Sequence, residues 1–213
     1  MKDFVFPFST CEKIQHNHII KQPYSAFVNA LSVSIILLFL LNTKFGPTFV
    51  FYVSLFFFQF FHMFSHMFHL DGYIQTNVIH SISYFINFSL FYLLYSISNM
   101  FPSIYFIIMY IVFIAMDIYA FTYLTLLYFI PTQIMLLLSI LFYYYQYLPA
   151  LFKDNMLLFI FIVLLISGII YNEKVNGKEM LANYPDFPFH IFVEIPGLFI
   201  FTFLMYVFHS SSK

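Results

Sequence analysis

Histidine and serine side chains form a regular pattern in one apolar stretch of the chain. His62, Ser65, His66 and His69 are spaced at i, i+3, i+4 and i+7, which places all four on one face of an α-helix. Imidazole nitrogens bind divalent transition metals, and a hydroxyl beside them can donate a hydrogen bond. The spacing therefore predicts a polar stripe that faces the interior of a helical protein.

A second pair, His190 and Glu194, is four residues apart, a spacing that lets two side chains of one helix reach the same metal ion. Nitrogen and carboxylate oxygen together suit zinc in a catalytic site that keeps a position for water. A structural interpretation stays open, because a histidine in an apolar helix is more often a hydrogen-bonded packing residue than a metal ligand. In that case His66 bonds a neighbouring helix and His62 a backbone carbonyl. Asp117 is then either a structural acceptor or a residue that supports a ligand.

The elements that must carry these residues are membrane helices. Of the 213 residues, 62% are hydrophobic, 24% are aromatic and only 8% are charged, whereas about a quarter are charged in a soluble domain. A water-soluble globule of this composition could not cover its surface with polar groups. Since about 20 apolar residues suffice for one crossing, the composition predicts an all-α, polytopic membrane protein, a single transmembrane helix bundle with short loops.

Seven apolar runs bounded by polar residues or proline are the predicted spans. They cover residues 26–42, 47–70, 78–98, 103–122, 124–148, 156–171 and 187–209. A six-span bundle is the alternative, because two helices follow each other almost directly near Pro131, which either begins a helix or kinks one. Residues 1–24 then form a polar N-terminal segment, residues 25–209 the seven-span membrane domain and residues 210–213 a short tail.

Charge and cysteine content exclude some functions. The formal net charge is −1, which argues against nucleic-acid binding, since that requires a basic surface. Cys11 is the only cysteine, so no internal disulfide can form. A seven-span bundle places Lys44, Lys153 and Lys213 on one side and the other five lysines opposite, which leaves the orientation open. The N-terminal segment lacks the basic-then-apolar order of a signal peptide, so the first span is expected to act as the targeting signal.

Several of these residues follow the order and spacing of a known family. Cys11-Glu12, followed by Asn29, matches its N-terminal frame, and Ser65-x-x-x-His69 matches the motif of its second span. The chain resembles the alkaline ceramidases, seven-span zinc hydrolases of a wider superfamily that includes adiponectin-receptor-like proteins. The resemblance covers most of the chain.

Two central positions differ from that family. His80 stands eleven residues beyond His69, where the family has an aspartate, and Glu194 replaces the second histidine of a His-x-x-x-His motif. The resemblance implies His69, His190 and Glu194 as zinc ligands. It also implies Ser65 as a hydrogen-bond donor to the developing oxyanion and His80 as a base that relays a proton to the leaving amine. As a fourth ligand, His80 would close the water position.

The reaction implied by the resemblance is zinc-dependent hydrolysis of a lipid amide, ceramide in that family, to a sphingoid base and a fatty acid. The lipid substrate would enter from the bilayer, and in a eukaryotic cell the membrane would be that of the endoplasmic reticulum or Golgi. Calcium is not expected, because Glu12 matches the family's calcium site but Ala26 and Ile14 replace two other positions. Nothing in the sequence indicates an oligomeric state.

Three other functions stay open. The substitutions at His80 and Glu194 favour a catalytically degenerate, non-enzymatic relative of the ceramidases. A histidine-rich lipid oxidase would use His62, His66 and His69 as one of its boxes, but the sequence has no further His-x-x-His-His box. A transporter could use intramembrane aspartate and histidine as a proton relay, although no internal duplication is apparent.

Overall fold

Helices account for the regular secondary structure in the part of the chain that the computed structural model describes, residues 12–15, 17–68, 72–123 and 126–211. In chain order they are α1 (Pro23–Leu41), α2 (Pro47–Phe68), α3 (Gly72–Ser98), α4 (Ile104–Tyr123), α5 (Leu126–Tyr143), α6 (Ala150–Asp154), α7 (Met156–Asn183) and α8 (Ile191–Ser211). A 3₁₀ turn at Tyr145–Tyr147 lies between α5 and α6.

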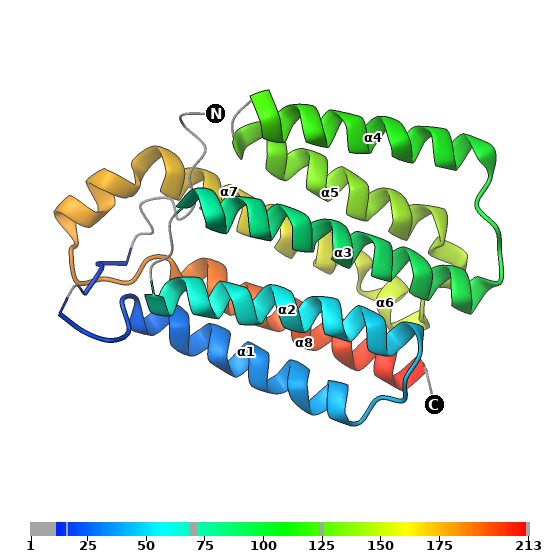
Figure 1. Ribbon diagram of the computed structural model, residues 1–213, viewed down its shortest axis with the longest axis horizontal. Helices are drawn as coiled ribbons and strands as arrows, with labels where there is room; N and C mark the ends of the chain where they lie inside the picture. Colours follow the sequence, from blue (N-terminus) through cyan, green and yellow to red (C-terminus); the bar gives the residue numbers. More distant parts are fainter. Residues whose placement is uncertain (1–11, 16, 69–71, 124–125, 212–213) are drawn as a thin grey trace.

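All the helices except the short α6 run side by side along the long axis of the molecule (Figure 1). Helix α1 packs against α2 and α8, α2 against α3, α3 against α5, α4 against α5, and α7 against α8. Successive long helices run in opposite directions, so α1, α3, α5 and α8 begin at one end of the bundle, where α2, α4 and α7 finish (Figure 1). We call this end the site end.

Among the described residues, six helices are long and apolar enough to cross a membrane. They are α1, α2 and α4 over their full lengths, and the segments Asn77–Ser98 of α3, Met156–Glu173 of α7 and Ile191–Ser210 of α8. The predicted all-α polytopic bundle is therefore confirmed. Helix α5 has a shorter apolar stretch, Pro131–Tyr143. The described helices therefore agree with the six-span alternative, and the bundle has seven spans only if α5 also crosses the membrane.

Large apolar side chains cover the outside of the bundle as well as its interior. Tyr52, Leu55 and Leu94 are buried between helices, and the Tyr52 hydroxyl donates a hydrogen bond of 2.6 Å to the Met205 carbonyl, which joins α2 to α8. In contrast, Leu157 and Phe199 on the outside are 83% and 64% exposed. An outer surface of this kind is suited to acyl chains and not to water.

Two helix boundaries differ from the predicted spans. Helix α7 continues past its apolar part to Asn183, and α8 begins at Ile191, so residues 187–190 of the last predicted span precede the helix. The reason is that hydropathy marks the membrane, whereas backbone hydrogen bonds continue a helix beyond it.

Candidate metal centre

Four side chains converge at the site end of the bundle, two from α2 and two from the start of α8. His62, His66, His190 and Glu194 each offer one ligand atom, and these atoms all lie within 4.8 Å of one another. His66, His190 and Glu194 are buried, whereas the His62 side chain is 18% exposed. The arrangement joins the second and the last membrane helices at one point.

The distances between these atoms fit a small metal ion. Glu194 Oε1 lies 2.9 Å from His190 Nε2, 3.3 Å from His66 Nε2 and 3.6 Å from His62 Nε2, and the last two nitrogens are 3.2 Å apart. Zinc bonds of about 2.0–2.1 Å in tetrahedral geometry separate neighbouring ligand atoms by about 3.3 Å. The four residues could therefore coordinate one ion with small adjustments.

Two of the imidazole rings are oriented by a contact on their other nitrogen. His190 Nδ1 lies 2.8 Å from Glu173 Oε2 on α7, and His66 Nδ1 lies 2.7 Å from Gln22 Oε1, directly before α1. Because a carboxylate and an amide oxygen only accept hydrogen bonds, each Nδ1 must carry the proton. Each Nε2 of the neutral ring then keeps a lone pair aimed at the centre, as in metal-binding histidines.

Unsatisfied buried atoms at the centre also fit a cation. His190 Nε2 and Glu194 Oε1 make no hydrogen bond with other described residues, although they are buried and only 2.9 Å apart. A nitrogen lone pair and a carboxylate oxygen repel each other at this distance unless a proton or a metal ion lies between them. A metal ion would satisfy both atoms and the two α2 histidines at once.

Local structure explains how α8 places its two ligands. His190 lies just before the helix, and its carbonyl accepts hydrogen bonds from the backbone N–H groups of Val193 at 2.9 Å and Glu194 at 3.3 Å. Its side chain therefore keeps the helical i, i+4 relation to Glu194. Glu194 is in the first turn of α8, where the positive end of the helix dipole stabilises a carboxylate.

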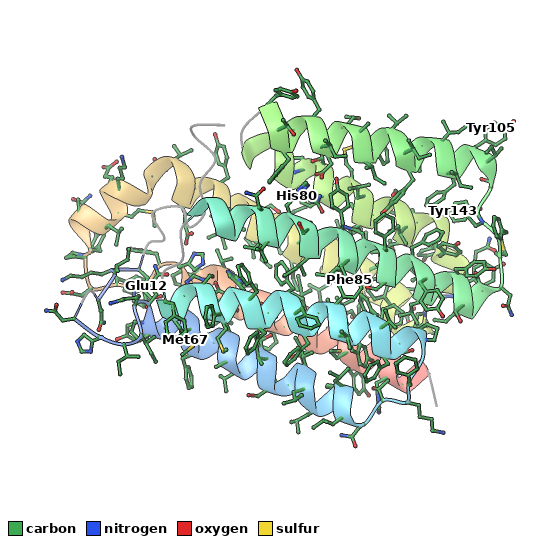
Figure 2. All side chains as sticks on the ribbon, in the orientation of Figure 1. Glu12, Met67, His80, Phe85, Tyr105 and Tyr143 are labelled. Carbon is green, nitrogen blue, oxygen red and sulfur yellow. The ribbon has the colours of Figure 1, made fainter. Side chains whose placement is uncertain are left out.

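The N-terminal segment holds the α2 side of the centre. The backbone N–H groups of Lys21 and Gln22 donate to the carbonyls of Met67 at 2.9 Å and His66 at 3.1 Å, in the last turn of α2. The buried Glu12 carboxylate in turn accepts hydrogen bonds from the backbone of the first turn of α1. Figure 2 shows Glu12 and Met67 close together at the site end.

Only some of the site residues predicted from the sequence lie in this group. His190 and Glu194 are both in the group, while His69 lies outside the described residues. Ser65 is buried in α2, and its hydroxyl donates a hydrogen bond of 2.7 Å to the His62 carbonyl. The structure adds His62 and His66, for which the sequence left a packing role open, and their i, i+4 spacing within the stripe is the signal that pointed to them.

His80 belongs to a second polar cluster, formed by α3, α4 and α5. Its Nε2 lies 2.9 Å from Asp117 Oδ2, and its ring stacks on Phe121. Figure 2 shows His80 on the side of α3 that faces α4 and α5. Asp117 is fully buried and also accepts hydrogen bonds of 2.7 Å from the hydroxyls of Tyr84 and Thr132. The described contacts of His80 thus connect it to Asp117 and its neighbours, and Asp117 has the structural acceptor role that the sequence left open.

The fold and this centre define an α-helical, multi-pass membrane protein with a group of side chains that could bind a metal ion. Comparison of the chain with protein-family models, curated proteins and solved structures finds no match.

Proposed function

We propose that this protein is a zinc-dependent hydrolase of the membrane that cleaves a lipid amide supplied by the bilayer. The observation that carries the proposal is the convergence of three imidazole nitrogens and one carboxylate oxygen. Two of the imidazole rings are also held in place by a hydrogen bond at Nδ1, the nitrogen that points away from the centre. Such oriented rings are typical of metal ligands. The amide as the bond cleaved rests on the resemblance to the alkaline ceramidases.

Charge balance supports a doubly charged ion. Glu194 and Glu173 are both buried, and each is within 3 Å of His190. Two buried carboxylates among neutral imidazoles carry a charge of −2, and such a charge is costly to bury without a cation beside it. Zinc matches both this charge and the nitrogen-rich ligand set.

The residues of the chain would divide the chemistry among them. A bound zinc ion supplies a Lewis acid that polarises a carbonyl oxygen and makes water a better nucleophile. His66, His190 and Glu194 form a fixed, buried face of the centre. His62 has the most exposed side chain of the four and is the ligand that substrate or water can reach. The apolar outer surface of the spans would accept the lipid directly from the membrane.

A metal-stabilised, non-enzymatic protein is the second candidate function. It is favoured by the presence of four side chains, because a zinc ion with four protein ligands has no position left for water. The role of His62 separates the two functions. A hydrolase needs His62 to be an exchangeable ligand, whereas a structural site needs it as a permanent one.

The test is the metal content of the purified protein, measured by elemental mass spectrometry. We expect about one zinc per chain in the wild type and in the control variant His209→Ala, which changes a histidine at the other end of α8. His190→Ala and Glu194→Ala should lose the metal, since each removes a buried ligand.

His62→Ala should keep most of its zinc if the protein is a hydrolase, because three anchored ligands remain. Loss of zinc from His62→Ala as complete as that from His190→Ala would favour the structural site. A wild type without metal would contradict both functions. Zinc that is present in the wild type and retained in His62→Ala would justify assaying the protein with ceramides and related lipid amides.

A further inference from the structure

Glu173 is a buried carboxylate in a part of α7 whose neighbours are exposed. It is 1% exposed, whereas Asn172 and Glu179 on the same helix face outward. We propose that Glu173 is a positioning residue for the metal centre, which sets the orientation and the basicity of His190. This inference rests on the proposed binding of a metal ion and goes beyond it, since Glu173 is not one of the four ligands.

The contacts of Glu173 support a role directed at His190. Its Oε2 lies 2.8 Å from His190 Nδ1, and its buried Oε1 makes no hydrogen bond with the described residues. Most buried side-chain polar atoms have a hydrogen-bond partner, and the partner that the structure gives the Glu173 carboxylate is His190. Here the described polar contact is with the ligand alone, from a helix that supplies no ligand itself.

A carboxylate behind an imidazole changes the metal-binding nitrogen. It holds the proton on Nδ1, fixes the plane of the ring and increases the electron density at Nε2. His66 has the neutral amide of Gln22 in the equivalent place. Only one of the two oriented rings therefore has a charged partner, and Glu173 and Glu194 together supply the charge of −2 that a divalent ion balances.

Glu173→Gln tests this inference with little change of shape, because the amide keeps an oxygen that can accept a hydrogen bond from His190 Nδ1–H. The protein is titrated in detergent with Zn²⁺ and, separately, with Co²⁺, which accepts the same ligands and absorbs visible light. We expect zinc affinity to fall by about 10- to 100-fold and the cobalt absorption bands to shift. Glu179→Gln makes the same change at an exposed position of α7 and should bind both ions like the wild type.

The cobalt spectrum separates positioning from general stability, since a merely structural residue would alter the amount of folded protein and not the bands of the bound ion. Glu173→Asp keeps the charge, so it should recover part of the affinity, and it provides a second measurement if the glutamine variant does not fold. Equal affinity and identical bands in Glu173→Gln and the wild type would overturn the role of Glu173, as would a folded Glu173→Asp that binds no better than Glu173→Gln. A wild type that binds neither ion would instead overturn the metal centre itself.

Discussion

His66 and His190 reach the centre in the same way although they belong to different helices. Each ring has its Nδ1 bonded to an oxygen of a third segment, Gln22 for His66 and Glu173 for His190. An imidazole held at one nitrogen has little freedom at the other, so both Nε2 atoms are preorganised. At the scale of single residues, the geometry therefore favours His66 over His62 as the candidate metal ligand from α2.

A comparison of His66 and His69 tests this selection. We expect His66→Ala to lose bound zinc, because it removes a buried, oriented ligand, and elemental mass spectrometry of the purified variant measures the loss. The resemblance to the ceramidases predicts the same loss for His69→Ala. If His69→Ala loses its zinc while His66→Ala keeps it, the group of four residues is not the centre.

Sequence alone could identify the stripe but could not choose among its histidines. Successive residues of a helix are rotated by roughly 100°, so His62, His66 and His69 all fall within a narrow sector of one face. In an ideal helix, residues three apart differ by about 4.5 Å along the axis, so the choice between His66 and His69 depends on how α2 and α8 meet, which the sequence does not encode locally. Glu173 could not be found at all, because it lies among polar residues at the end of an apolar run, where a solvated side chain is the expectation.

One carboxylate connects the hairpin of α4 and α5 to α3 by hydrogen bonds. Asp117 of α4 accepts hydrogen bonds from His80 and Tyr84 of α3 and from Thr132 of α5. In a membrane there is little hydrophobic force between helices, so bonds of this kind contribute to their association. At the scale of elements, the second polar cluster serves as a connection between three helices.

Asp117→Ala should loosen this connection. Since interhelical hydrogen bonds in membranes contribute about 0.6–1.7 kcal/mol each, removing all three should destabilise the protein by about 2–5 kcal/mol. Unfolding of the detergent-solubilised protein measures the loss, and metal content should be less affected than stability. Asp117→Asn keeps one acceptor oxygen and should cost less, so equal stabilities for both variants and the wild type would contradict the role of the cluster.

The helices themselves were predictable because a long apolar run in a membrane has few alternatives to a helix. The partners of Asp117 were not, since they come from α3 and α5 and depend on which helices become neighbours. The predicted span at 124–148 was also longer than the helix, because the chain turns after Tyr143 into the 3₁₀ turn while the sequence stays apolar.

The buried histidine and carboxylate side chains of α2, α4 and α8, together with His80 of α3, gather in one half of the molecule. The metal centre and the Asp117 cluster both lie toward the site end, where α2 and α4 finish and α3 and α8 begin. The opposite half of the bundle is filled largely by apolar residues such as Phe51, Leu94 and Phe208. At the scale of the whole molecule, the group that could bind a metal ion and the Asp117 cluster therefore lie toward the same end of the bundle.

The number of membrane crossings predicts on which sides of the membrane the two ends of the chain lie. If α5 crosses the membrane, seven crossings place an N-terminal tag and a C-terminal tag on opposite sides. Protease protection of each tag in sealed vesicles measures this, and the side that exposes the N-terminal tag is also the side of the metal centre. Tags exposed on the same side would mean that α5 does not cross and that the bundle has six spans.

The metal centre draws on Gln22, on α2, on α7 and on α8, so its parts are made at widely separated times during translation. A nascent chain that has inserted α1 and α2 has Gln22 and the two α2 histidines of the group, but it lacks Glu173, His190 and Glu194 until the last helices leave the ribosome. If the proposed ion binds here, its loading follows insertion of α8. A bound ion would then report that the helices from both ends of the chain have come together.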